Sequence, residues 1–203
     1  MLVEALREAA RRAGVALLAG TAAVANGGLR VGDRDIHAGA VVNAAGHAAG
    51  RLSRRVPVRP VKGQILTLAP RPDHPSPLRR MVRTPSCYLV PRPDGRVVVG
   101  ATQEERGDRD VTAVGVLDLL DDALRISPEL AELRLAGTAA GLRPATADLR
   151  PAIGADQDGL VWATGGFRHG VLLLPAAGPA IAAAARGETV PDDIRQFDPG
   201  RFA

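Results

Sequence analysis

Apolar residues are arranged in two different patterns along this chain, and the change between them limits the fold more than any other feature. Short continuous apolar runs, typical of buried strands, occur near both ends, at residues 40–45 (AVVNAA) and 160–164 (LVWAT). From Pro57 the pattern changes to an alternating strand at 65–68 and a series of turns. This order predicts an α/β fold in which an antiparallel sheet, with a helix against it, is inserted between two parts of one α/β domain.

The first part of the chain predicts a helix followed by short strands. Residues 2–13 carry an apolar stripe at helical spacing. Residues 15–19 predict a short buried strand. Residues 22–36 predict a hairpin region, with turns at Asn26-Gly27-Gly28 and Gly32-Asp33. A helix, a strand and a second buried strand in this order are typical of a nucleotide-binding sheet.

The middle block, about residues 57–140, predicts a sheet with one helix. The expected strands are 65–68, 87–90, 96–102 and 133–142, with a turn at Pro93-Asp94-Gly95 between the second and the third. The expected helix is 112–126, with Thr112 as its cap and an apolar face of Val114, Leu117, Leu120 and Leu124. Residues 170–185, which follow the last strand and a turn at Gly165-Gly166, are apolar almost all round and predict a buried helix.

Composition argues against several functions. Only 2% of the residues are aromatic, too few for a platform on which nucleic-acid bases stack, and the net charge is only +4. Cys87 is the only cysteine and the four histidines are far apart, which argues against disulfides and metal sites and favours a cytoplasmic location. The longest apolar run, 170–185, is too short to span a membrane. No GxGxxG, P-loop or GxSxG motif occurs.

Five short segments, taken in order, carry a family resemblance. They are 41–46 (VVNAAG), 60–64 (PVKGQ), 87–102, 140–144 (AGLRP) and 165–173 (GGFRHGVLL). In order and spacing this set resembles the FAD-dependent amino-acid oxidases of the D-amino-acid oxidase group, and within that group the glycine oxidases of thiamine synthesis. Each segment alone is weak evidence, but the set extends over nearly the whole chain. The resemblance implies part of a Rossmann-like FAD-binding domain with an inserted antiparallel substrate-binding domain.

The resemblance also implies roles for three side chains. Tyr88, the only tyrosine, matches the family residue whose hydroxyl holds the substrate carboxylate, although a core position is commoner for a tyrosine. Arg143 matches the arginine that grips this carboxylate in a bidentate fork, although most arginines lie at the surface. Arg168 is expected to face the active site near the flavin, the alternative being solvent exposure at a helix N-terminus.

Contacts to the cofactor follow from the same resemblance. The positions expected to contact FAD are Ala23, Gly46, Gly166, Phe167, Arg168, His169, Gly170, Val171 and Leu172. Glycines let the backbone approach the flavin ring, and the positive N-terminus of the following helix suits the negative charge that builds on the ring. The family usually has histidine at Gly166 and asparagine at His169, so only backbone contacts are expected to be kept there. Cys87 does not match the site of covalent flavin attachment, so non-covalent FAD is expected, without a metal.

The implied reaction is FAD-dependent oxidative deamination of glycine, a small amino acid or an amine. Dioxygen is the expected electron acceptor, and the products are an imine or glyoxylate, ammonia and hydrogen peroxide. The sequence leaves other classes open: an amino-acid dehydrogenase with another acceptor, a non-catalytic C-terminal remnant, or one half of a split flavoenzyme. No nucleic-acid or membrane partner is expected, and a homo-oligomer is compatible with the sequence.

The same resemblance divides the chain into three parts. Residues 1–56 are expected to belong to the FAD-binding domain, 57–140 to the substrate-binding domain, and 141–203 to the FAD-binding domain again, with a C-terminal helix and tail. The GxGxxG segment with which the family begins does not occur in these 203 residues. We therefore expect the chain to correspond to the C-terminal portion of such an enzyme, with an N-terminal portion as its partner.

Overall fold

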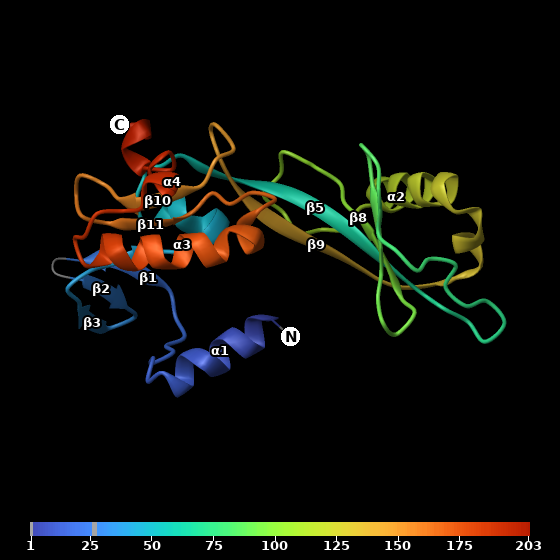
Figure 1. Ribbon diagram of the computed structural model, residues 1–203, viewed down its shortest axis with the longest axis horizontal. Coiled ribbons are helices and arrows are strands. Elements are labelled where there is room, and N and C mark those ends of the chain that lie inside the picture. The colour runs from blue at the N-terminus through green and yellow to red at the C-terminus, as the bar shows by residue number, and fades with distance from the viewer. Residues whose placement is uncertain (1, 26–27) are drawn as a thin grey trace. The chain divides into compact units, whose positions relative to one another are not determined.

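The computed structural model describes residues 2–25 and 28–203, and these form two compact units. The first unit ends at Val41 and the second runs from Val42 to Ala203. Figure 1 labels most of the helices and strands of both units, and each unit is described by itself below.

The first unit confirms the predicted helix and hairpin strands, but not the strand between them. Its elements are α1 (Leu2–Arg12) and an antiparallel sheet in the order β1 (Ala22–Ala25), β2 (Gly28–Val31) and β3 (Arg34–His37). Gly32-Asp33 forms the turn between β2 and β3 as predicted, whereas Asn26 and Gly27 of the other predicted turn lie outside the described residues. The prediction of a buried strand at 15–19 is wrong, because no described strand pairs with this segment and its side chains are exposed.

Two sheets organise the second unit (Figure 1). The smaller has the order β10 (Ala152–Ala155), β11 (Val161–Thr164) and β4 (Val42–Asn43). The larger is antiparallel, in the order β6 (Val82–Arg83), β7 (Tyr88–Pro91), β8 (Val97–Gly100), β5 (Val58–Ala69) and β9 (Arg134–Thr146). In the smaller sheet β11 runs parallel to β4, so their carboxyl ends lie at the same edge.

Several strand boundaries differ from the predicted ones. The run at 40–45 gives only the two-residue strand β4, because its partner β11 pairs only with Val42 and Asn43. By contrast, β5 and β9 are longer than predicted, because they pair with each other along their whole length. β9 runs without a break across residue 140, where the sequence places a domain boundary. The division into three parts stays a prediction.

The second unit also contains three α-helices and three short 3-10 helices. They are α2 (Ala113–Ile126), α3 (Gly170–Ala185), α4 (Asp192–Arg195), η1 (Gly46–Arg51), η2 (Pro128–Glu132) and η3 (Pro199–Phe202). Among the residues described, no helix is long and apolar enough to cross a membrane.

α2 packs on one face of the larger sheet with a side that matches the predicted one only in part: Leu120 and Leu124 pack against the core, whereas Val114 and Leu117 are exposed. Thr112 is its N-cap, as predicted, because its Oγ1 accepts a hydrogen bond from the Gly115 N–H at 3.2 Å. The buried side chains are Leu119 and Ala123, whereas Val114 is 62% exposed. The reason is Gly115, where a Cβ would lie 2.5 Å from Gln64 of β5. The helix therefore approaches the sheet along the line from Gly115 to Ala123.

α3 is buried over only half of its length. Ala177, Ala180 and Ala183 pack against the smaller sheet, and this half forms one of the three apolar cores. In its first turn, Val171 is 67% exposed and Leu172 is 77% exposed. The prediction of a fully buried helix is therefore wrong at the N-terminal end, because no described element of this unit covers it.

Candidate active site

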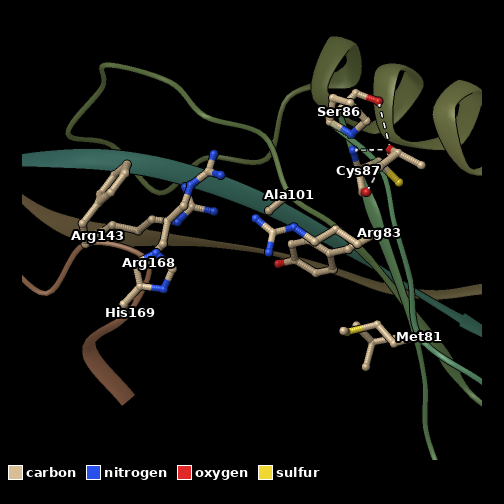
Figure 2. Close-up of a pocket in the computed structure, with 13 residues that line it drawn as sticks. Met81, Arg83, Ser86, Cys87, Ala101, Arg143, Arg168 and His169 are labelled. Atoms are coloured by element: carbon tan, nitrogen blue, oxygen red, sulfur yellow. Dashed lines mark hydrogen bonds between the residues drawn. The ribbon is translucent and has the colours of Figure 1, made fainter. Parts of the chain in front are cut away.

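A cavity of about 780 Å³ lies between the turn before α3 and the face of the larger sheet opposite α2. Five of the predicted site residues line it: Tyr88, Arg143, Phe167, Arg168 and His169. Figure 2 shows that Arg143 and Arg168, from different elements, extend their side chains toward the same part of the cavity. The cavity thus brings together residues that are far apart in the sequence, from Met81 to His169.

Tyr88 lies flat against the sheet because the neighbouring strand has a glycine there. Tyr88 on β7 pairs with Gly100 on β8. A Cβ on Gly100 would lie 2.7 Å from the Tyr88 hydroxyl and 2.8 Å from its Cζ. Only glycine leaves this space open. The sequence thus positions the phenol at the cavity wall with a hydroxyl that can donate a hydrogen bond.

Arg143 is held in the same way, by a second glycine. A Cβ on Gly63 of β5 would collide with the guanidinium of Arg143. Nη1 donates hydrogen bonds to the carbonyl oxygens of Lys62 at 3.3 Å and Thr102 at 3.1 Å. Among the described residues, Nε and Nη2 find no acceptor, so one edge of the planar fork is available to a ligand. Two parallel N–H groups on that edge match the geometry of a carboxylate.

The environment of Arg143 is positive and partly dry. Burial lowers the pKa of the Arg143 guanidinium, the Arg168 charge lowers it further, and Tyr88 acts in the opposite direction. The group stays protonated at any physiological pH. An anionic ligand would relieve both effects, because it compensates the buried charge and the repulsion between two like charges.

The turn between β11 and α3 brings Arg168 to the cavity. The Phe167 N–H donates to the Pro144 carbonyl at 3.1 Å, which fixes the turn to the residue after Arg143. Arg168 donates from Nη2 to Oε1 of Gln103, and its guanidinium lies 5.7 Å from the centre of the Phe167 ring. Phe167 has a φ of 42° and Gly165 a φ of 75°, so this turn uses backbone conformations that most residues avoid.

The start of α3 fits a planar, electron-accepting ring. The helix has 16 residues and begins without a side-chain cap, so the N–H groups of its first turn carry a positive dipole end. At Gly166 and Gly170 no side chain covers the backbone, and a Cβ on Gly166 would lie 2.7 Å from the Gly170 Cα. The exposed side chains of Val171 and Leu172 add an apolar surface beside these donors. The predicted flavin-binding positions of this segment therefore fit a flavin.

Two predicted FAD-binding positions, Gly46 and Ala23, lie outside the segment 166–172 at the start of α3. Gly46 follows β4, and its carbonyl accepts a hydrogen bond from the Thr164 hydroxyl at 3.0 Å, at the common carboxyl edge of β4 and β11. In open α/β sheets ligands bind at this edge. Ala23 is an exposed residue of β1 in the first unit, whose placement is described only within that unit.

Sequence reasoning missed one charged residue of the cavity. Arg83 also lines it, and so does the exposed Met81. Arg83 pairs with Tyr88 across β6 and β7, so both side chains lie on the same face of the sheet. The available signal was the register of this short hairpin, which the sequence does not define. Among the described residues, no group of three or more histidine, cysteine or acidic residues could hold a metal.

The chain also resembles known proteins over nearly its whole length. Residues 1–184 match the family of FAD dependent oxidoreductases. The chain is 37% identical over 219 residues to the hydrogen cyanide synthase subunit HcnC of Pseudomonas aeruginosa, which covers 99% of this chain and 51% of that protein. The chain thus spans about half the length of this relative.

Two solved structures share the fold. Iminodiacetate oxidase from Chelativorans sp. BNC1 has a TM-score of 0.87 and 30% identity, covering 98% of this chain and 57% of that one. Glycine oxidase from Geobacillus kaustophilus has a TM-score of 0.74 and 32% identity, covering 86% and 47%. These likenesses confirm the expected α/β fold class. The chain therefore belongs to the family of FAD-dependent oxidoreductases that the motifs indicate, and FAD is the cofactor of this family.

Proposed function

We propose that these 203 residues supply the substrate cavity and the flavin-ring contacts of an enzyme that oxidises glycine or another small amino acid. The convergence of Tyr88, Arg143 and Arg168 on one cavity supports this most strongly. One structure with the same fold is that of a glycine oxidase. A role in thiamine synthesis and a cytoplasmic location stay predictions.

The residues of the cavity suggest how the substrate is held. Nε and Nη2 of Arg143 bind the carboxylate, and the Tyr88 hydroxyl donates a hydrogen bond to it. This anchor orients the Cα–H bond of the substrate toward the start of α3. Holding reactants in a fixed geometry removes much of the entropic barrier to reaction. Bound FAD supplies the two-electron acceptor for the hydride.

The flavin end of FAD is assigned to the start of α3. The flavin ring would be held mostly by backbone groups of the segment Gly166, Phe167, Arg168, His169, Gly170, Val171 and Leu172. Gly46, at the carboxyl edge of β4 and β11, is a further proposed contact to FAD. Ala23 stays a predicted contact to FAD. The pyrophosphate needs a glycine-rich turn at a helix N-terminus, and no GxGxxG occurs in these residues. A polypeptide that carries this motif would complete the FAD site.

Substitution of Arg143 tests the proposal in the flavin-loaded enzyme. Leaving a buried carboxylate unpaired costs about 2–5 kcal/mol, so Arg143→Ala is expected to raise the KM for glycine at least tenfold while FAD stays bound. Arg134→Ala is the matched control, because Arg134 is an exposed arginine at the start of the same strand. A KM within twofold of the wild-type value for Arg143→Ala would remove Arg143 as the anchor.

Reoxidation separates the proposed oxidase from a dehydrogenase. After reduction by substrate, an oxidase returns to its oxidised absorbance rapidly in dioxygen and releases hydrogen peroxide. A dehydrogenase reoxidises rapidly only with a quinone or another carrier. Stopped-flow absorbance with each acceptor measures this difference directly.

A further inference from the structure

The cavity carries more positive charge than one carboxylate needs. Arg83, Arg143 and Arg168 line it, and no aspartate or glutamate is among the lining residues. Within the part of the chain that the structure describes, none of these three arginines forms an ion pair. Elsewhere, Arg59 and Arg201 lie 2.9 Å from carboxylate oxygens. The cavity lining thus contains three arginine side chains and no carboxylate to balance them.

The three arginines differ in how many donors they have left. Arg143 uses Nη1 on two backbone carbonyls. Arg168 donates to Gln103 and stacks near the Phe167 ring. The side chain of Arg83 makes no hydrogen bond to a described residue. Figure 2 shows its guanidinium extending toward the side of the cavity where Arg143 and Arg168 lie. Arg83 is thus the arginine with its whole fork available.

We propose that the preferred substrate is an amine that carries two carboxylates, and that Arg83 binds the second one. This rests on the proposed function, in which Arg143 and Tyr88 bind the first carboxylate. Arg83 is exposed and its fork has no counter-charge, and a carboxylate matches it well, because bidentate arginine–carboxylate pairs are among the strongest hydrogen-bonded contacts.

Two kinds of dicarboxylate share this chemistry. In one, the second carboxylate is carried by a substituent on the amine nitrogen, as in iminodiacetate. In the other, it is carried by the side chain, as in aspartate. N-Methylglycine is the matched probe with a single carboxylate, because it differs from iminodiacetate only by the second carboxylate.

Isothermal titration calorimetry under anaerobic conditions, with the flavin reduced beforehand by dithionite so that no probe can be oxidised, measures the affinity for each probe without turnover. We expect iminodiacetate or aspartate to bind at least about tenfold more tightly than N-methylglycine. Arg83→Leu is expected to abolish that preference while changing the N-methylglycine affinity less than twofold, and Arg83→Lys to restore part of it. Arg80→Leu is the control, because Arg80 is an exposed arginine three positions away that does not line the cavity.

Several results would overturn the second-carboxylate site. The first is equal affinity of the wild-type enzyme for probes with one and with two carboxylates. The second is an equal loss of affinity for both kinds of probe in Arg83→Leu. The third is a loss of the dicarboxylate preference in Arg80→Leu as large as that in Arg83→Leu. Failure of the proposed function has a different signature. If the tighter dicarboxylate binding depends on Arg83 but no amine reduces the flavin, the oxidase proposal fails and the binding site stands. If glycine is oxidised with no preference for dicarboxylates, only the second-carboxylate site fails.

Discussion

The contact between the Arg143 guanidinium and Gly63 gives a sharp test of how the carboxylate site is built. An added Cβ at position 63 would collide with the guanidinium, so Gly63→Ala must displace it from the carbonyls of Lys62 and Thr102. The position itself accepts alanine, because the φ of Gly63 lies outside the left-handed region. The perturbation therefore acts on Arg143 and not on the strand.

The expected loss of stability in Gly63→Ala follows from the hydrogen bonds that Arg143 loses. Hydrogen bonds from charged groups contribute about 1.5–3 kcal/mol each, and two long ones, at 3.1 and 3.3 Å, together contribute about 2–3 kcal/mol. Replacing glycine by alanine also raises the free energy of unfolding by about 0.4–1 kcal/mol, because alanine restricts the unfolded chain more than glycine does. We expect the free energy of unfolding to fall by about 1–2 kcal/mol and the affinity for N-methylglycine to fall at least about tenfold.

Gly141→Ala is the matched control for this experiment. Gly141 pairs with Gly63 across β5 and β9, and a Cβ there would meet no atom within 4 Å. Urea unfolding gives the stability of each variant, and anaerobic calorimetric titration of the flavin-loaded enzyme, its flavin reduced beforehand by dithionite, gives the affinity for N-methylglycine. Unchanged affinity in Gly63→Ala, or the same loss in both variants, would refute the reasoning.

Three further predictions concern single side chains. Tyr88→Phe should raise the KM for glycine by the equivalent of about 0.5–1.5 kcal/mol if the lost hydrogen bond is neutral, and up to about 3 kcal/mol if it is charged. Burial raises the pKa of the Cys87 thiol to about 11, so iodoacetamide at pH 8 should modify it only after unfolding. The Arg201 guanidinium lowers the pKa of Asp148, so the stability from this pair is present above about pH 4 and lost as the pH falls. Asp148→Asn should therefore destabilise the protein at pH 7, and urea unfolding should show this difference shrinking below pH 4.

Local patterns predicted those elements whose signals lie within a few residues. The hairpin at Pro93-Asp94-Gly95 and the cap at Thr112 depend on neighbouring residues, and both are found. Residues 15–19 have the apolar character of a strand, but a strand also needs a partner, which a local pattern does not reveal. The face of α2 was predicted only in part for a similar reason, because the close approach at Gly115 depends on Gln64, far away in the sequence.

The candidate active site was also predicted where the signal is local and missed where it depends on contacts between distant residues. Tyr88, Arg143 and Arg168 were found through motifs, and they line one cavity. Arg83 belongs to no motif and reaches the cavity only through its pairing with Tyr88. The roles of Gly63 and Gly100 as space for large side chains also depend on cross-strand register, which the sequence does not define. Ala23 and the other predicted FAD contacts stay predictions.

The central claim is that Arg143 and Tyr88 bind the carboxylate of an amine next to FAD at the start of α3. The most direct test is anaerobic titration of the flavin-loaded enzyme with glycine, N-methylglycine and methylamine, followed by flavin absorbance. We expect the two amino acids to bleach the oxidised flavin, methylamine at the same concentration to leave it oxidised, and Arg143→Ala to remove the difference. Bound FAD that no amino acid reduces, or equal bleaching by methylamine, would contradict it.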